Sequence, residues 1–157
     1  MEDNAKVKVK NRSLSPVYYS VPEMNNLRRE YQPREEKTVF FEELRKLYYT
    51  TGGKVLLDDY LIIEDKEALE ELGMHVEPEY FYEKEQVIDL LENGSMDEFL
   101  DCLDFAPEGV IELIKQCSVI LPLNDVAKRN VLLERYDFNV AKTVEIIEES
   151  KKTENEE

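Results

Sequence analysis

The chain has 157 residues, of which 36% are charged and 42% are hydrophobic, and its formal net charge at pH 7 is −16. Residues 1–60 carry 11 Lys or Arg and 10 Asp or Glu, whereas residues 61–157 carry 9 basic and 26 acidic residues. An acidic segment repels phosphate groups, so direct binding of nucleic acid by the C-terminal part is not expected, and its partners should be proteins with basic surfaces.

No apolar run approaches the roughly 20 residues that a membrane-spanning helix needs, and residues 1–13 lack the hydrophobic stretch of a secretory signal. The two cysteines, Cys102 and Cys117, lie in apolar helical sequence. We expect buried thiols rather than a disulfide or a metal pair, in a protein made and kept in the cytosol of its cell.

Residues 1–73 are predicted to form a β-rich module. Val7 and Val9 alternate with lysines, and a period of two is typical of a strand with one buried face. Further β-prone runs lie at 17–21, 27–31, 37–40 and 61–63. Short strands of this kind form a small antiparallel sheet whose apolar face needs a cover.

One or two helices are the predicted cover of this sheet. Residues 41–49 place apolar side chains at spacings of three and four, and 54–60 is predicted to add a helical turn or two. Asp65 can cap a third helix that ends at Gly73, because glycine tolerates a positive φ at that position.

The period then becomes helical. Residues 74–82, with Pro78 among them, are predicted to be an extended linker, 83–151 an acidic helical module, and 152–157 a flexible tail. Helices are expected at 84–92, 95–103, 107–117, 125–136 and 140–151. Ser95 and Glu98 form a capping box at the start of one of them. The chain is therefore predicted to have an α+β fold.

The helical module contains a short internal sequence repeat. Residues 100–105 and 110–114 align without gaps, at an offset of 33, with 133–138 and 143–147. Each copy reads as helix, Asp-Phe turn, helix, and two stacked helix-turn-helix units can cover each other's apolar faces. The equivalent corner residues, Phe105 and Phe138, are then expected to be buried.

No residue constellation indicates a reaction, so we expect no enzyme, no metal site and no cofactor. His75 is the only histidine and is expected in an exposed loop, and Thr51-Gly52-Gly53-Lys54 lacks the spacing of a phosphate-binding loop and is expected to end a helix. Asp97, Asp101 and Asp104 fall on one helical face, which is more typical of a solvated, partner-facing surface than of a cation site.

Two clusters are candidate contact surfaces. Arg28, Arg29 and Arg34 surround Tyr31 and are suited to binding carboxylates or a nucleic-acid backbone. Pairing with the neighbouring Glu30, Glu35 and Glu36 is the simpler explanation of the cluster. The aromatic run Tyr80, Phe81 and Tyr82 is either an interface anchor or a means of docking the linker onto the helical module.

Three stretches of the sequence carry a resemblance to a known class of protein: the run 21–33, the Gly52-Gly53 pair with Leu56-Leu57 and Tyr60-Leu61, and the run 94–110. With them, most of residues 6–147 resembles small acidic proteins that tailed bacteriophages of Gram-positive hosts encode among their virion genes. The resemblance carries no active site.

It implies a non-enzymatic virion structural or assembly protein that acts through protein–protein contacts with other phage structural proteins. Such a protein is found in the virion, and in the host cytoplasm during assembly, and can form oligomers. The alternative is an acidic inhibitor, or DNA mimic, that binds the basic groove of a host defence or nucleic-acid enzyme.

Overall fold

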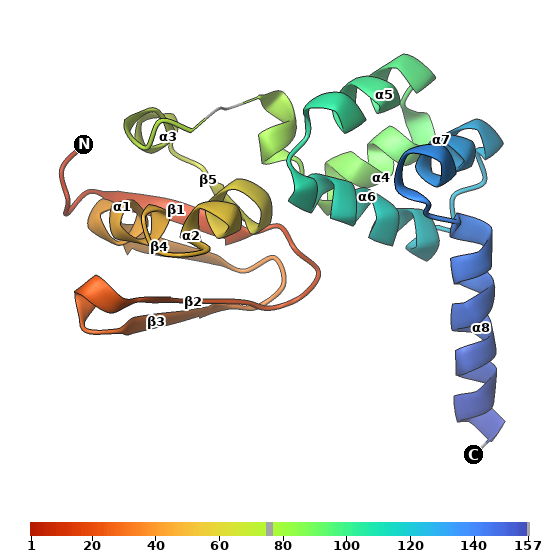
Figure 1. The fold of residues 1–157 in the computed structure, drawn as a ribbon, viewed down its shortest axis with the longest axis horizontal. Coiled ribbons are helices and arrows are strands. Elements are labelled where there is room, and N and C mark those ends of the chain that lie inside the picture. The colour runs from red at the N-terminus through yellow and green to blue at the C-terminus, as the bar shows by residue number, and fades with distance from the viewer. Residues whose placement is uncertain (75–76, 157) are drawn as a thin grey trace. The chain divides into compact units, whose positions relative to one another are not determined.

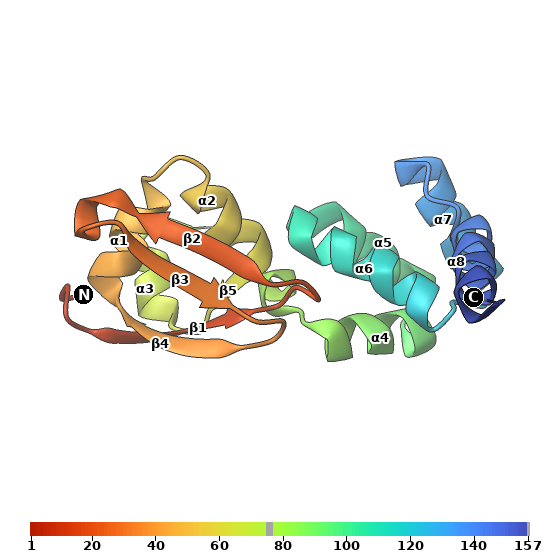
Figure 2. The ribbon, with the colours of Figure 1, turned by 90° about the horizontal axis from the view of Figure 1, so that it is seen from below.

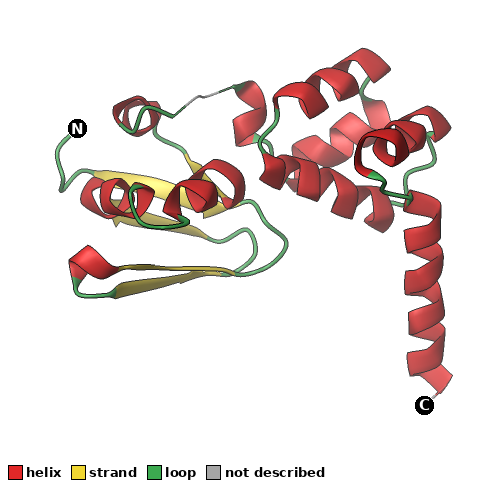
Figure 3. Cartoon of the chain, in the orientation of Figure 1, coloured by secondary structure: helices red, strands yellow, loops and turns green. Residues whose placement is uncertain are grey.

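The computed structural model describes residues 1–74 and 77–156 and divides into two compact units. The first unit comprises Met1–Glu83 together with Phe105–Val110, and the second comprises Lys84–Asp104 and the residues from Ile111 onward. Every strand of the described residues lies in the first unit, whereas the second unit is helical (Figures 1 and 3). The predicted α+β fold is confirmed.

Five strands form at the positions that the alternation indicated. They are β1 (Lys6–Asn11), β2 (Val17–Val21), β3 (Leu27–Tyr31), β4 (Glu36–Phe40) and β5 (Leu61–Ile63). They do not form one sheet, however, because β4, β1 and β5 make a three-stranded antiparallel sheet while β2 and β3 make a separate two-stranded ribbon. Figure 2 shows β2 and β3 running side by side.

Strand β1 is the centre of the larger sheet because its alternation supplies a buried row. Val7 pairs with Val39, and Val9 pairs with Ile63, and all four side chains are buried. The strand ends at Asn11, whose Nδ2 donates hydrogen bonds to the carbonyl oxygens of Ser15, Tyr31 and Gln32. This buried amide therefore ties the end of the sheet to the end of the ribbon.

Helices complete the core of the first unit. They are α1 (Phe41–Tyr48), the short α2 (Gly53–Val55) with the π-helical turn Leu56–Tyr60, and α3 (Lys66–Glu71). Asp65 accepts a hydrogen bond from the N–H of Ala68 and Gly73 has a φ of +70°, so both predicted ends of α3 are confirmed.

The second unit is formed by five helices in the described residues. They are α4 (Lys84–Asn93), α5 (Met96–Phe105), α6 (Glu108–Ile120), α7 (Val126–Tyr136) and α8 (Val140–Glu156), although the α5–α6 corner belongs to the first unit. Ser95 Oγ accepts the N–H of Glu98, as the capping box predicted. Cys102 and Cys117 are both buried, which confirms their predicted place in the core.

Two predictions about irregular segments are wrong. Residues 78–81 form a 3₁₀-helix rather than an extended linker, because Tyr80 is drawn into the core of the first unit. The predicted tail is helical as far as Glu156, since 148–155 contain neither glycine nor proline to end α8. His75 lies outside the described residues.

The predicted equivalence of Phe105 and Phe138 is also wrong. The Phe105 side chain is 58% exposed, whereas Phe138 is half-buried. The corners differ in backbone, because Asp104 and Phe105 are the last residues of α5, while Asp137 follows α7 in the left-handed region with φ of +53°. Both copies are helix-turn-helix units, but their corners do not match.

The exposure of Phe105 predicts that its truncation destabilises the protein less than truncation of Phe99, a buried ring on the same helix. Phe105→Ala should change the free energy of unfolding by about 0.5 kcal/mol or less, because an exposed ring loses little packing. Phe99→Ala should cost about 3–5 kcal/mol, since the Phe99 ring is fully buried. Urea unfolding of the two variants and the parent measures both values, and equal losses would contradict the assignment of Phe105 to the surface.

Candidate functional site

The β2–β3 ribbon separates the residues of the arginine cluster between its two faces. Val17, Tyr19 and Tyr31 are buried, whereas Tyr18 and Arg28 project to the surface. Neighbouring residues of a strand point to opposite faces, so the two arginines at 28 and 29 also diverge. Tyr31 was predicted to contact a partner; this is wrong for the folded chain, because its ring is fully buried.

Arg29 belongs to a buried hydrogen-bond network under the ribbon. Its Nη2 lies 2.9 Å from Oε1 of Glu43, a carboxylate on α1 whose side chain is only 2% exposed. The Tyr19 hydroxyl donates to Oε2 of Glu43 and lies 3.2 Å from the Tyr31 hydroxyl. The hydrogen bond with Glu43 raises the pKa of Arg29, and burial raises the pKa of Tyr19 and of Tyr31.

The network holds the ribbon on α1 and takes Arg29, but not Arg28 or Arg34, out of the predicted contact cluster. The neighbouring glutamates are not the partners of Arg29, since Glu35 pairs with Lys37 and Glu36 with Lys8. Arg28 and Arg34 are exposed, and Arg34 sits in a turn with φ of +65°. A hollow beside the ribbon is lined by Tyr18, Tyr19, Ser20, Arg28, Arg29 and Glu30.

The aromatic run anchors to the first unit, not to the helical module as one alternative proposed. Tyr80 is buried, its hydroxyl donates to the carbonyl of Leu57 at 3.0 Å, and it accepts the N–H of Ile63 at 3.1 Å. Phe81 packs edge-on against it with a ring-centroid separation of 5.1 Å, and Tyr82 is half-buried. Burial raises the pKa of Tyr80 to about 12.

Arg12 is a residue that sequence reasoning missed. Its side chain is 1% exposed, its Nη2 donates to the carbonyl oxygens of Asp58 and Leu61, each at 3.4 Å, and its guanidinium lies 5.1 Å from the centre of the Tyr80 ring. Burial lowers the pKa of Arg12 to about 10. An arginine that follows a strand in a turn is usually exposed, so no signal in the sequence indicated this position.

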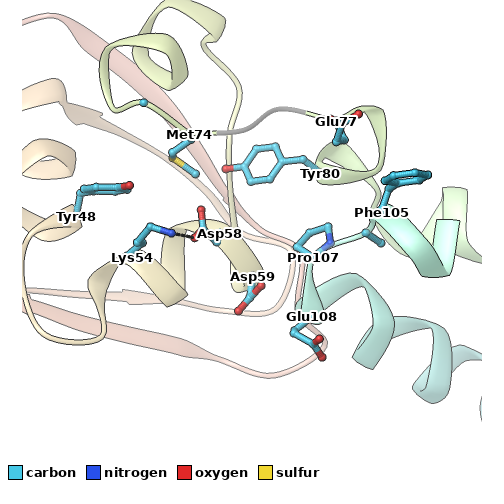
Figure 4. Close-up of a pocket in the computed structure, with 12 residues that line it drawn as sticks. Tyr48, Lys54, Asp58, Asp59, Met74, Glu77, Tyr80, Phe105, Pro107 and Glu108 are labelled. Carbon is cyan, nitrogen blue, oxygen red and sulfur yellow. Dashed lines mark hydrogen bonds and ion pairs between the residues drawn. The ribbon is translucent and has the colours of Figure 1, made fainter. Parts of the chain in front are cut away.

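A pocket of about 540 Å³ lies in the first unit, with Tyr80 in its wall (Figure 4). It is lined by Tyr48, Lys54, Asp58, Asp59, Gly73, Met74, Glu77, Tyr80, Phe105, Ala106, Pro107 and Glu108. Lys54 Nζ lies 3.0 Å from Oδ2 of Asp58, four residues later in the chain. The Thr51-Gly52-Gly53-Lys54 motif is thus a turn, with Gly52 at φ of +80°, that delivers Lys54 to the pocket.

Asp59, which lines this pocket, is held by the backbone of Gly109. The Gly109 N–H donates a hydrogen bond to the Asp59 carboxylate, and a Cβ on Gly109 would lie 1.7 Å from the Asp59 carbonyl oxygen. Only glycine allows this approach. Burial, together with the charge of Asp58, raises the pKa of Asp59.

The three aspartates of α5 that were predicted to contact a partner are only partly available for such a contact. Asp97, Asp101 and Asp104 are all exposed, as predicted, but Asp104 Oδ1 lies 2.8 Å from Nη1 of Arg135. Asp97 and Asp101 have no ion-pair partner within residues 1–74 and 77–156. These two carboxylates are the members of this set that face solvent without a counter-charge.

The comparisons with known proteins add no relative: no family model, no curated protein and no solved structure matches the chain. Among the described residues, no group of three or more His, Cys, Asp or Glu is arranged to hold a metal ion. None of the described helices has both the length and the apolar character required to cross a membrane.

The hydrogen-bond network under the ribbon predicts different roles for two adjacent arginines. Arg29→Ala should lower the free energy of unfolding by about 1–3 kcal/mol, because the buried Glu43 carboxylate loses its cationic partner. Arg28→Ala, its matched control on the outer face, should change it by about 0.5 kcal/mol or less. Chemical denaturation measures both, and adding Glu43→Gln to Arg29→Ala should recover part of the loss. Equal effects of the two single substitutions would disprove the separation of the faces.

The raised pKa of Tyr80 predicts loss of stability in alkali. A tyrosine ionises at about 10 in the unfolded chain, so the stabilisation is complete below pH 10 and is lost as the pH rises from about 10 to 12. Each proton contributes at most about 1.4 kcal/mol per pH unit.

Tyr80→Phe should flatten the decline of the unfolding free energy between pH 10 and 12 and also lower stability at pH 8 by about 1–3 kcal/mol, because the Ile63 N–H and Leu57 carbonyl lose their partner. Denaturant titrations at several pH values test this. The control is Tyr18→Phe at an exposed ring, which should track the parent, and a Tyr80→Phe slope as steep as the parent's would refute the assignment.

Proposed function

We propose that this protein is a non-enzymatic bacteriophage virion structural or assembly protein that acts through protein–protein contacts, in the virion and, during assembly, in the host cytoplasm. The resemblance described above supports the phage context. The observation that carries the binding mode is the use of charges in the helical unit: Lys128, Arg129 and Arg135 are engaged by carbonyl groups or a carboxylate, while Asp97 and Asp101 remain on the surface.

Lys128 shows this use of cations most clearly. Its side chain is 3% exposed, and its Nζ donates to the carbonyl oxygens of Leu90, Leu91 and Gly94 at 3.2, 3.0 and 2.6 Å. These carbonyls lie at the C-terminal end of α4, where carbonyl groups have no partner within the helix and the helix dipole is negative. The ammonium group of Lys128 therefore caps the C-terminal end of α4.

Two arginines are used in a similar way. The Arg129 side chain donates to the carbonyl of Leu123, and Arg135 pairs with Asp104. With these cations engaged, the face of α5 that carries Asp97 and Asp101 presents negative charge to an approaching protein. A surface of this kind fits a partner with clustered Lys and Arg, which the field of the carboxylates attracts and orients.

The position of the protein is tested by mass spectrometry of gradient-purified particles of the phage that encodes it. Presence at a fixed copy number per particle supports the proposal. Consistent absence from particles, with recovery of the protein on a host nuclease or polymerase, would replace it with the inhibitor hypothesis.

The contact surface is tested with charge reversal. Asp97→Lys combined with Asp101→Lys should slow association with the particle partner at least about 10-fold, because steering depends on these exposed charges. The matched control, Glu64→Lys combined with Glu70→Lys, makes the same change in net charge on the first unit and should have a small effect. Binding of the parent should weaken as salt rises, since charges more than about 8 Å apart are screened at physiological ionic strength.

Stopped-flow or biosensor kinetics at two salt concentrations measure these rates. Association that is indifferent to salt, or equal losses in the two double variants, would mean that the α5 face is not the contact surface.

A further inference from the structure

The three-stranded sheet of β4, β1 and β5 has one closed edge and one open edge. At the outer edge of β5, the Tyr80 hydroxyl accepts the N–H of Ile63, and Nη2 of Arg12 donates to the carbonyl oxygen of Leu61. Side chains therefore satisfy backbone groups that β5 turns away from β1. Strand β4 forms the other edge, which Figure 2 shows at the rim of the first unit, and among the described residues β4 pairs with β1 alone.

The hydrogen-bond pattern identifies the backbone groups of β4 that face outward. The N–H of Phe41 donates to the carbonyl oxygen of Ala5 at 2.8 Å, and bonded pairs recur at every second residue of an antiparallel ladder. The odd-numbered residues of β4 therefore bond to β1, while Glu36, Thr38 and Phe40 turn their N–H and C=O groups outward. In the part of the chain that the structure describes, no hydrogen bond uses the N–H or C=O of Thr38. Such a row of groups is a template for another strand.

Strand β4 also lacks the usual protection of an edge strand. A proline, a bulge or a lysine that projects across the edge commonly prevents pairing. The strand contains no proline, and its register with β1 is unbroken. Its Lys37 is engaged by Glu35 at 3.4 Å and lies 5.7 Å from the centre of the Tyr31 ring. Phe40 leaves 51% of a large apolar side chain exposed, which an added strand would help to cover.

The sequence of β4 is complementary to itself when two copies run antiparallel. A two-fold axis at Thr38 sets Thr38 opposite its own copy, Glu36 opposite Phe40 of the second copy, and Lys37 opposite Val39. No like charges are opposed, and a Thr–Thr pair is a favourable cross-strand contact. Parallel pairing in register would instead set Glu36 beside Glu36 and Lys37 beside Lys37. The charges of the strand thus favour the antiparallel arrangement.

We propose that two copies of this protein join through their β4 edges, with antiparallel pairing centred on Thr38, so that their three-stranded sheets become one continuous sheet. The strand has only five residues, and a short contact of this kind gives a weak dimer with a Kd on the order of 100 µM. The dimer is independent of the proposed function, because it requires neither the α5 face nor a virion partner.

The first experiment is sedimentation velocity of the full-length protein between about 10 and 500 µM, in about 50 mM and about 500 mM NaCl. A monomer–dimer equilibrium is expected, and the Kd should be at least about 3-fold lower in the higher salt. Each copy carries a net charge of −16, so salt screens the repulsion between two copies. A protein that stays monomeric at every concentration in both salts would overturn the proposal.

A proline variant tests the role of the backbone. Thr38→Pro removes an N–H that faces outward and leaves the hydrogen bonds to β1 in place, so it should weaken the dimer at least about 10-fold. Its matched control is Thr38→Val, which keeps the N–H and should dimerise within about 2-fold of the parent. Circular dichroism verifies that both variants are folded. A folded Thr38→Pro variant with the Kd of the parent would show that β4 is not the interface.

Charge variants test the register without a proline. Phe40→Glu places a carboxylate opposite Glu36 of the second copy at both ends of the paired strands, and it should weaken the dimer at least about 5-fold. Adding Glu36→Lys to Phe40→Glu makes both pairs attractive and should recover most of the lost affinity. If the double variant is as weak as Phe40→Glu alone, the antiparallel register centred on Thr38 is wrong.

Discussion

The Tyr80 hydroxyl is the contact on which the first unit depends. It sits between the carbonyl of Leu57, at the π-helical turn, and the N–H of Ile63, in β5, so it satisfies two backbone groups where a helix ends and a strand begins. The same ring covers the guanidinium of Arg12 and forms a wall of the pocket. Without the phenol these polar groups would be buried without a partner, which costs more than the hydrogen bonds gain.

The sequence was sufficient for the five strands and for most of the helices, because local patterns mark them clearly. Val7 and Val9 mark a strand by period two, and Asp65 and Gly73 mark the ends of a helix by their capping chemistry. The division of the strands between a sheet and a ribbon was not predictable in this way. It depends on long-range contacts such as the three hydrogen bonds of Asn11, which follow from no local pattern.

The arginine cluster shows what a local rule could have added. Within β3, Arg29 and Tyr31 share one face and Arg28 lies on the other, since side chains alternate along a strand. Period two alone therefore separates Tyr31 from Arg28. The partner of Arg29 was beyond reach, because Glu43 lies 14 residues away on α1 and is buried only once the ribbon has packed.

The contacts of the aromatic run and the existence of the pocket could not be predicted from the sequence, for a different reason. Three consecutive aromatics after Pro78 were compatible with any docking surface, and only the distant backbone groups of Leu57 and Ile63 decide which one. The pocket similarly joins Lys54 and Asp59 to Phe105, residues about fifty positions apart. Glycine at position 109 is the single local sign, because its missing Cβ is what allows the corner to reach Asp59.

The separation of charge connects the fold to binding. Lys128 closes the end of α4 from inside the helical unit, and Arg135 neutralises Asp104, so folding itself consumes cations and leaves a surplus of carboxylates outside. The carboxylates of such a surface repel one another and destabilise the folded state. Burial of apolar residues must offset this cost. At physiological salt both the repulsion and the attraction act over about 8 Å, so a basic partner of the kind proposed above would be attracted only once it lies close to the face of α5.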